Sequence, residues 1–245
     1  MSIVLEAIVL KSFDYQDHHK IVKMISPSHG LISVFVSYAN KKKSRYRAIA
    51  EALTCVNITV RESNEGQGGL YYLVHGDIID SYYDWKMDYQ LIMMFYEMAE
   101  IIIKGDIESL HLPHVYRTLK AVLNIAATDG LKIQWGVVAF KGKMLIATGI
   151  TPAFNGCVSC GGVKKIVTAS VSEGGLICED CYTGDGIWLK TDFIPLWRAL
   201  FMAPMDRLLA LGVTKDQVEA LECWMLAYLE GYSNIKFMNR SVLSL

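Results

Sequence analysis

Four cysteines in two closely spaced pairs constrain this chain more than any other feature. The pairs are Cys157 with Cys160 and Cys178 with Cys181, and residues 161–177 separate them. Two such turns can bring four thiolates around one tetrahedral metal ion, and the spacing is typical of a single Zn²⁺ site. Because sulfur takes all four ligand places, none is left for water, and the zinc is expected to be structural. Two disulfides, or four unliganded thiols, are the alternatives.

The other cysteines and the first residues bear on the compartment. Cys55 and Cys223 stand alone in apolar surroundings and are expected to be buried thiols. The N-terminal segment has no basic residue before its apolar residues, and Glu6 interrupts them, so no secretory signal is expected. The most apolar stretch, 91–103, contains two glutamates and is too short to span a bilayer. We expect a cytoplasmic protein without a membrane segment.

The first eighty residues have the pattern of a small barrel. Strands are expected over 3–11, 20–25, 31–38, 56–61 and 70–79, with a short helix from Ser44 to about Leu53. Gly30 is expected to close the second hairpin with a positive φ. Three strands, a helix and two strands is the order of an OB-fold, which often binds oligonucleotides across strands 2 and 3. Other small barrels share this order.

The hydrophobic period changes to that of helices after Trp85. Helices are expected over Leu91–Ile102 with a stop at Lys104-Gly105, from Val115 to near Gly130, over Trp135–Ile146, and from the capping box at Thr214 to about Leu229. The fold class is therefore α+β and multidomain. It comprises an N-terminal OB-fold β-barrel (1–80) and an α-helical domain (81–245) that carries an inserted four-cysteine zinc finger (150–186).

A run of cations without an acid marks a candidate nucleic-acid surface, although the formal net charge is only −1. The run, here called the basic loop (residues 41–47), contributes five cations, and two more lie upstream. Their attraction for phosphates acts locally, within about 8 Å at physiological salt. Tyr38 and Tyr46 are candidates for base stacking. A solvated loop is the alternative. The candidate DNA-binding residues are Lys20, Lys23, Lys41, Lys42, Lys43, Arg45 and Arg47.

Motifs for catalysis are absent, so we expect no enzyme. The segment from Gly136 to Lys143 has the wrong glycine spacing for a phosphate-binding loop, and Met144 stands where Ser or Thr would bind magnesium. Asp77 and Asp80 at a strand end are more simply turn residues than a metal-binding pair.

The order of several segments resembles the bacterial recombination and repair mediator family RecO. These segments are Ala7-Ile-Val-Leu-Lys11 with Asp14-Tyr15, Lys20-Ile-Val22, His29-Gly-Leu-Ile-Ser33, Lys43-Ser-Arg-Tyr46, Leu70-Tyr-Tyr-Leu73, the paired cysteines with Gly174-Gly-Leu-Ile-Cys178, and Asn239-Arg-Ser241.

The resemblance implies an OB domain, a helical domain and a zinc finger inserted between helices. It implies a protein that binds single- and double-stranded DNA and anneals complementary strands coated by the single-stranded-DNA-binding protein. It also implies that the protein acts with RecR, and indirectly with RecA, to load recombinase. Such a protein is not an enzyme and would be nucleoid-associated in a bacterial cytoplasm.

Two expectations concern protein partners. Lys236 and Arg240, beside two apolar residues, are candidates to hold the acidic C-terminal tail of the single-stranded-DNA-binding protein that the resemblance implies. A frayed C-terminus is the alternative there. For the whole chain, the alternative function is a zinc-containing scaffold that binds acidic peptide tails without direct DNA contact.

Overall fold

The computed structural model of the chain describes residues 2–62, 70–184, 189–233 and 235. The structure forms two compact units. One unit holds the residues through Ile103 together with Ile107–Leu123, and the other holds Lys104–Asp106 with the residues from Asn124 onward. A compact unit need not be an independently folding domain. The domain boundaries 1–80, 81–245 and 150–186 therefore stay a prediction.

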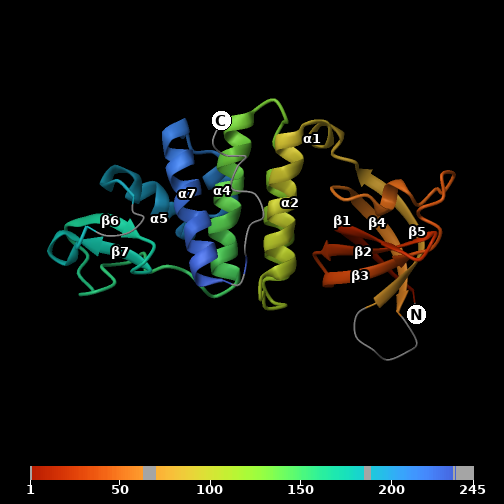
Figure 1. Cartoon of the computed structure of the whole chain (residues 1–245), viewed down its shortest axis with the longest axis horizontal. Helices are drawn as coiled ribbons and strands as arrows, with labels where there is room; N and C mark the ends of the chain where they lie inside the picture. Colours follow the sequence, from red (N-terminus) through yellow and green to blue (C-terminus); the bar gives the residue numbers. More distant parts are fainter. Residues whose placement is uncertain (1, 63–69, 185–188, 234, 236–245) are drawn as a thin grey trace. The chain divides into compact units, whose positions relative to one another are not determined.

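The first unit is built on a closed five-stranded barrel (Figure 1). Its strands follow one another around the barrel in the order β1-β2-β3-β5-β4, and β1 pairs with β4 to close it. Strands β3 and β5 are parallel, whereas the other neighbours are antiparallel. This arrangement confirms the OB-like barrel. The strands are β1 (Ser2–Tyr15), β2 (His19–Ser26), β3 (Gly30–Val36), β4 (Cys55–Glu62) and β5 (Leu70–Asp80).

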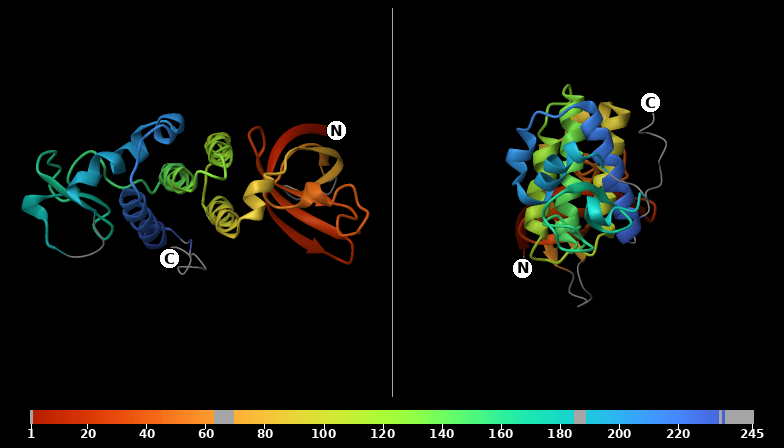
Figure 2. Two further views of the ribbon diagram at one scale, coloured as in Figure 1. Left: turned by 90° about the horizontal axis from the view of Figure 1, so that it is seen from above. Right: turned by 90° about the vertical axis from the view of Figure 1, so that its left-hand side faces the viewer.

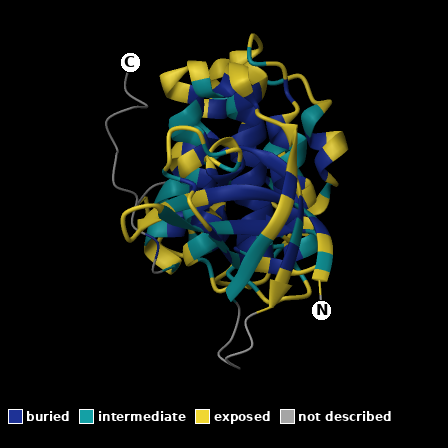
Figure 3. Ribbon diagram, turned by 90° about the vertical axis from the view of Figure 1, so that its right-hand side faces the viewer, coloured by how far each residue is buried: buried dark blue, intermediate teal, exposed yellow. Residues whose placement is uncertain are grey.

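Alternation of side chains along the strands fills the barrel. Val22, Val34 and Ile58 are almost completely buried, while Lys23, Ser33 and Asn57 between them are at least partly accessible. In Figure 3 much of the barrel sheet is coloured as buried, whereas β5 is intermediate or exposed along most of its length. The β-branched residues that predicted the strands are thus also the ones that form the barrel core.

Strand β1 is longer than predicted because it serves two neighbours. Residues 2–8 pair with β4, and residues 8–15 pair with β2. A register shift between Val9 and Lys11 bends the strand between these two partners. Such a bulge lets one strand contribute to both sides of a closing barrel.

The short helix predicted from Ser44 to Leu53 is wrong. Only a single 3₁₀ turn, η1 (Ala48–Ala50), forms, and the chain becomes extended at Glu51. Leu53 has a positive φ and donates its N–H to the Val9 carbonyl at 2.9 Å. Ile49 and Ala50 are buried against the barrel core. The helical spacing of apolar residues therefore reflects a segment that covers the barrel, with no extended helix.

The helices described in the first unit are α1 (Tyr83–Met87), α2 (Tyr89–Lys104) and α3 (Leu112–Leu123). Helix α2 ends at Lys104 as predicted. Helix α3 packs on β2 and β3 at the turn where Gly30 has φ +65°, which confirms the predicted positive φ. A Cβ atom at Gly30 would lie 2.6 Å from Cδ1 of Leu112, so only glycine fits this approach. The prediction that the second helix runs to near Gly130 is wrong, because α3 stops at Leu123.

A polar cluster joins α3 to the first strand of the barrel. The Glu6 carboxylate accepts hydrogen bonds from the Tyr116 hydroxyl and, at 2.5 Å, from the Lys120 ammonium. The hydrogen bonds from Lys120 and then Tyr116 hold the pKa of Glu6 below its usual value. Glu6 and Lys120 are only partly buried, so solvent weakens the pair without abolishing it.

The second unit is helical, with a small two-stranded sheet, β6 (Ile166–Ser170) and β7 (Gly175–Cys178), between its helices in sequence. The helices are α4 (Gly130–Ala147), α5 (Ile194–Met202), α6 (Met205–Leu209) and α7 (Lys215–Tyr232). Helices α4 and α7 run side by side in Figures 1 and 2. Helix α4 begins at Gly130 because the Asp129 side chain caps it. The predicted capping box of α7 is present, since Thr214 and Gln217 exchange side-chain and backbone hydrogen bonds.

Large aromatic residues form the core of the second unit. The rings of Trp197 and Trp224 meet edge to face at 5.1 Å, and Trp197 also packs against Phe201. Gly142, one of the glycines of α4, lets this helix approach α5 closely, because a Cβ atom at Gly142 would lie 3.0 Å from Cβ of Leu200. Lys141 of α4 is fully buried and donates to Glu222 of α7. No helix of the described residues is both long and apolar enough to cross a membrane.

Replacing Glu6 by Gln tests the link between α3 and the barrel. The folded pKa of Glu6 is lowered, so its charge stabilises the fold above the unfolded value of 4.5 and this contribution is lost as pH falls through the folded value. We expect Glu6→Gln to lower the unfolding free energy by about 1 kcal/mol near pH 7, after allowance for solvent screening. The difference should vanish in acid.

Urea unfolding from about pH 7 down to about pH 3, followed by circular dichroism, measures this effect. Glu108→Gln is the control, because Glu108 is exposed and lies outside this cluster. A destabilisation by Glu6→Gln that stays constant into acid would show that shape, and not charge, explains the contact.

Candidate nucleic-acid interface and metal centre

The basic loop follows β3 and folds back on the turn between β1 and β2. The backbone N–H of Asn40 donates to the His18 carbonyl at 3.1 Å. Within the loop, the N–H of Lys41 donates to Tyr38 and the N–H of Ser44 donates to Lys41, at 3.1 and 2.9 Å. These turns hold the backbone while the side chains point to solvent. All five cations of the loop are exposed, namely Lys41, Lys42, Lys43, Arg45 and Arg47.

Charge in the basic loop is not neutralised locally. Within the described part of the chain, none of its five cations forms an ion pair with a carboxylate. Two of them instead lie over aromatic rings: the Lys41 ammonium is 4.3 Å from the ring centre of Tyr38, and the Arg45 guanidinium is 4.5 Å from that of Tyr46. A cluster of unpaired, exposed cations attracts polyanions.

The two upstream lysines lie in different settings. Lys20 forms an ion pair with Asp14 at 3.1 Å, and its side chain is 22% exposed. A hydrogen bond from Asn40, followed by that from Lys20, lowers the pKa of Asp14. Lys23 lies on β2 opposite Ser33 and is half-buried. The structure therefore gathers the cations of the basic loop, whereas Lys20 already has a partner.

Sequence reasoning missed a row of residues across the outer face of the barrel. Strand registers align Phe13 with Ile21, Ile21 with Phe35, Phe35 with Tyr72, and Tyr72 with Arg61. The row thus crosses β1, β2, β3, β5 and β4 in turn. The Arg61 guanidinium lies 5.9 Å from the ring centre of Tyr72. Outward positions of a barrel in water are usually polar, so this row is unusual.

Three aromatic rings contact Phe35, and one of these contacts a further ring. The ring centre of Phe35 is 5.1 Å from His19, 5.4 Å from Tyr72 and 5.9 Å from Tyr15, and His19 is 5.0 Å from Tyr38. We call these five residues the aromatic patch. Tyr15 and Tyr38 are about half exposed. The patch lies on strands β1, β2, β3 and β5 and ends at the start of the basic loop.

The two tyrosines singled out from the sequence have different roles. Tyr38 belongs to the aromatic patch. Tyr46 packs against the barrel core, and its hydroxyl donates to the Val74 carbonyl at 3.1 Å, so its ring supports the loop. The alternating positions of Phe13 and Tyr15 on one strand were visible in the sequence. Their alignment with the aromatic residues of β3 and β5 needed the registers, which the sequence does not show.

The metal centre is formed by two turns beside the small sheet. In the first turn, the N–H of Gly161 donates to the Cys157 carbonyl at 2.8 Å, and the N–H of Cys157 donates to the Gly162 carbonyl at 2.8 Å. Gly161 has φ +74°, which favours glycine. In the second turn, Cys178 ends β7 and Cys181 ends a 3₁₀ turn, η2 (Glu179–Cys181).

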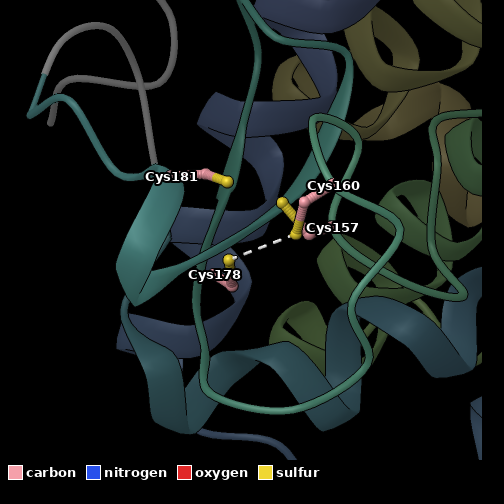
Figure 4. Close-up of side chains that lie close together, drawn as sticks. All are labelled: Cys157, Cys160, Cys178 and Cys181. Atoms are coloured by element: carbon pink, nitrogen blue, oxygen red, sulfur yellow. Dashed lines mark hydrogen bonds between the residues drawn. The ribbon is translucent and has the colours of Figure 1, made fainter.

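The four sulfur atoms face one another (Figure 4), and all lie within 4.8 Å. The Sγ atoms of Cys160 and Cys178 are 3.7 Å apart. A tetrahedron of sulfurs at about 2.3 Å from a central ion has edges of about 3.8 Å, so the cluster has the size of a metal site. Among the described residues no other group of three or more His, Cys or carboxylate side chains converges in this way.

Hydrogen bonds to sulfur favour the thiolate form of Cys157, whereas contacts with the neighbouring thiols raise the pKa of Cys160 and of Cys181. Burial raises the pKa of Cys157, but hydrogen bonds from the backbone of Cys178, Cys160 and Ser159 outweigh it and lower the value to about 6. The N–H of Gly162 also donates to Cys160 at 3.4 Å. N–H groups aimed at sulfur orient thiolate ligands and stabilise their charge. The described residues thus offer a closed set of four sulfur ligands for one metal ion.

The metal centre is tied to the helices through backbone carbonyls of the small sheet. The Trp224 indole donates to the Ala169 carbonyl at 2.8 Å, and the Tyr232 hydroxyl donates to the Ser172 carbonyl at 3.0 Å. A Cβ atom at Gly175 would lie 2.4 Å from the Ala153 carbonyl oxygen, so this close bridge requires glycine. The small sheet that carries the second turn is therefore fixed against the aromatic residues of α7.

The remaining candidates separate into three cases. Cys55 is buried, as predicted, and burial raises its pKa. The prediction that Cys223 is buried is wrong, because it lies on the solvent side of α7. Lys236 and Arg240 lie outside the described residues.

Comparison with known proteins places both parts of the chain in one family. Residues 1–82 match the model described as "Recombination protein O N terminal", and residues 97–241 match "Recombination protein O C terminal". The chain is 28% identical to "DNA repair protein RecO" of Listeria monocytogenes serotype 4b over 240 residues, which cover 97% of this chain and 92% of the relative. It is 27% identical to the Bacillus pumilus protein of that name, over 98% of this chain and 94% of the relative.

The cysteine cluster predicts one metal ion per chain. Elemental analysis of protein purified without chelator should find it. Cys178→Ser should release the ion and change tryptophan fluorescence, because Trp224 donates a hydrogen bond to Ala169 of β6, the strand that pairs with β7 beside the second turn. The matched control is Cys223→Ser, which removes an exposed thiol outside the cluster. Absence of metal from the unmodified protein, or equal loss in both variants, would contradict the site.

Proposed function

Because this chain belongs to the Recombination protein O (RecO) family, we propose that it is a DNA-binding mediator of recombination and repair. In this proposal it anneals complementary single strands and helps to load recombinase onto single-stranded DNA coated by its binding protein. The curated relatives carry the name "DNA repair protein RecO", and this name supports the repair role. The observation that carries the proposal is the basic loop beside an OB-like barrel: its five cations are exposed and have no acidic partner among the described residues.

The cations suit annealing because of what limits that reaction. Two complementary strands repel each other through their phosphates, and cations that neutralise both backbones lower this repulsion while the bases pair. Such contacts do not depend on sequence, as a general annealing protein requires. Lys20 would contribute only by leaving Asp14. No nucleotide or catalytic group is needed, and we propose that the protein is not an enzyme. The residues proposed to make most of the contacts are Lys41, Lys42, Lys43, Arg45 and Arg47, with Lys23 beside them.

We propose that the metal is one structural Zn²⁺ held by Cys157, Cys160, Cys178 and Cys181. Four sulfur donors without an oxygen or nitrogen ligand favour zinc over magnesium, calcium or manganese. When bound, the ion supplies local folding and no reactive water. The hydrogen bonds of Trp224 and Tyr232 hold the β6–β7 hairpin, which ends in the second turn, against α7.

Partners are proposed on the family alone. They are single- and double-stranded DNA, RecR, the C-terminal tail of the single-stranded-DNA-binding protein and, indirectly, RecA. Lys236 and Arg240 stay a prediction for the tail. We propose a cytoplasmic, nucleoid-associated protein, as the bacterial relatives suggest.

A charge-neutralised loop tests the function. Replacing Lys41, Lys42, Lys43 and Arg45 by glutamine should reduce the salt dependence of single-strand binding, because each phosphate contact contributes about 0.7 to the log-log slope. Four lost contacts would lower the slope by up to about 2.8. Affinity should fall similarly for unrelated sequences, and annealing should slow. Fluorescence anisotropy across a salt series and a strand-annealing assay measure the two effects.

The control variant removes the same charge from exposed residues of the second unit: Lys132, Lys164, Lys190 and Arg207. It should keep the slope and the annealing rate. If the salt slope and the annealing rate fall equally in both variants, the net charge of the protein, and not the basic loop, explains the DNA binding. If the unmodified protein binds no DNA but does bind acidic peptides, the scaffold alternative replaces the proposal.

A further inference from the structure

The aromatic patch Tyr15, His19, Phe35, Tyr38 and Tyr72 is larger than the barrel fold needs. Barrel closure depends on inward residues, whereas these rings lie on the outer face, with Tyr15 43% and Tyr38 53% exposed. We propose that the patch stacks the unpaired bases of a single strand whose phosphates lie along the basic loop. This inference rests on the proposed DNA-binding function and adds the preference for unpaired bases.

Contact geometry favours flat ligands. The rings of His19 and Phe35 are nearly parallel at 5.1 Å, while Tyr15 and Tyr72 meet Phe35 at steeper angles. Neighbouring rings thus present both faces and edges over several strands. Every base has a π-face, so such a surface takes single strands with little regard to sequence.

Charges at the border of the patch match a phosphate backbone. The exposed cations Lys41 and Arg61 lie 4.3 Å and 5.9 Å from the rings of Tyr38 and Tyr72, respectively. Cations with an aromatic neighbour at this distance keep their charge available to a further anion.

Among the described residues, the acids beside the patch are Asp14, Asp17 and Glu62, and Asp14 is already paired. On the β1 side, Asp14 forms its ion pair with Lys20 at 3.1 Å. Glu62, next to Arg61, accepts a long hydrogen bond from the Tyr71 hydroxyl at 3.5 Å and is the acid at the β4 edge. Asp17, in the turn between Tyr15 and His19, is exposed. Arg61 and the five exposed cations of the basic loop outnumber these acids, and none of the six forms an ion pair with a carboxylate among the described residues. This balance favours an anionic partner with flat apolar groups.

The same contacts would separate single from double strands. In a duplex the bases are stacked on one another and their faces are covered, so the patch has no surface to bind. The basic loop contacts phosphates, which both forms carry. We therefore assign the affinity for the phosphate backbone of either form to the basic loop. The preference for single strands over duplex DNA is assigned to the aromatic patch.

The first measurement uses the unmodified protein. Its affinity is compared for an oligothymidylate and for an abasic oligonucleotide of equal length and charge. We expect the oligothymidylate to bind roughly tenfold tighter or more for each stacked base, with the same salt slope. Equal affinity for both strands would overturn the stacking proposal while leaving the loop proposal intact.

The second measurement uses Phe35→Leu combined with Tyr72→Leu, which keeps apolar bulk and removes two ring faces. Affinity for oligothymidylate should fall roughly tenfold or more, while affinity for the abasic strand and for a duplex stays unchanged. Tyr89→Leu is the matched control, since Tyr89 is 67% exposed on α2 and outside the patch, and it should leave all three affinities unchanged.

Other outcomes assign the patch differently. If the double variant loses affinity for the oligothymidylate, the abasic strand and the duplex to the same extent, the two rings support the fold and do not stack bases. This result would overturn the proposal. Loss of binding to a short acidic, apolar peptide, with strand affinity unchanged, would assign the patch to a protein partner. No binding of any nucleic acid by the unmodified protein would remove the proposed function itself, and this result differs from each of the others.

Discussion

Pairing of strand β1 with two neighbours is the interaction on which the barrel depends. Its first half pairs with β4 and its second half with β2, and the shift between Val9 and Lys11 makes this possible. Without that bend the sheet would stay open, because β1 could not reach both edges. Closure also fixes the outer face. The pairing of β1 with β2, together with that of β2 with β3 and of β3 with β5, aligns Phe13, Phe35 and Tyr72, so the aromatic patch is a consequence of the strand registers of the barrel.

The second unit depends on a different constraint. The apolar residues that pack around the cysteine cluster are few: Ile177 is buried, and Ile166 is partly buried against it. Such a small core cannot offset the conformational entropy of ordering two turns. The metal ion that we propose would supply the missing free energy by crosslinking four thiolates. Hydrogen bonds from Trp224 and Tyr232 attach the β6–β7 hairpin, which ends in the second turn, to α7.

Sequence patterns predicted what depends on local chemistry, namely the cysteine cluster, the barrel strands and the capping box at Thr214. The five cations of the basic loop were visible for the same reason, because so many neighbouring charges have to be exposed. The predictions from sequence failed where tertiary contacts determine the local structure. The segment that covers the barrel imitates a helix because Ile49 and Ala50 are buried. The aromatic patch could not be predicted, because Phe35 and Tyr72 are far apart in the chain and meet only through the parallel pairing of β3 with β5.

A protein that anneals strands must hold bases without preventing their pairing, and the two parts of the proposed interface differ in this respect. Phosphate contacts persist after pairing, since a duplex has the same backbone. Stacking on the patch contributes about 1–3 kcal/mol per base and involves only the few bases that fit on it. Each step of a growing duplex contributes about 1.4 kcal/mol on average, and the duplex extends beyond the patch. Base pairing is therefore more favourable than stacking on the patch once a few base pairs have formed. A small patch beside an exposed set of cations suits this exchange better than a deep groove would, because a groove that enclosed many bases would hold the single strand against its complement.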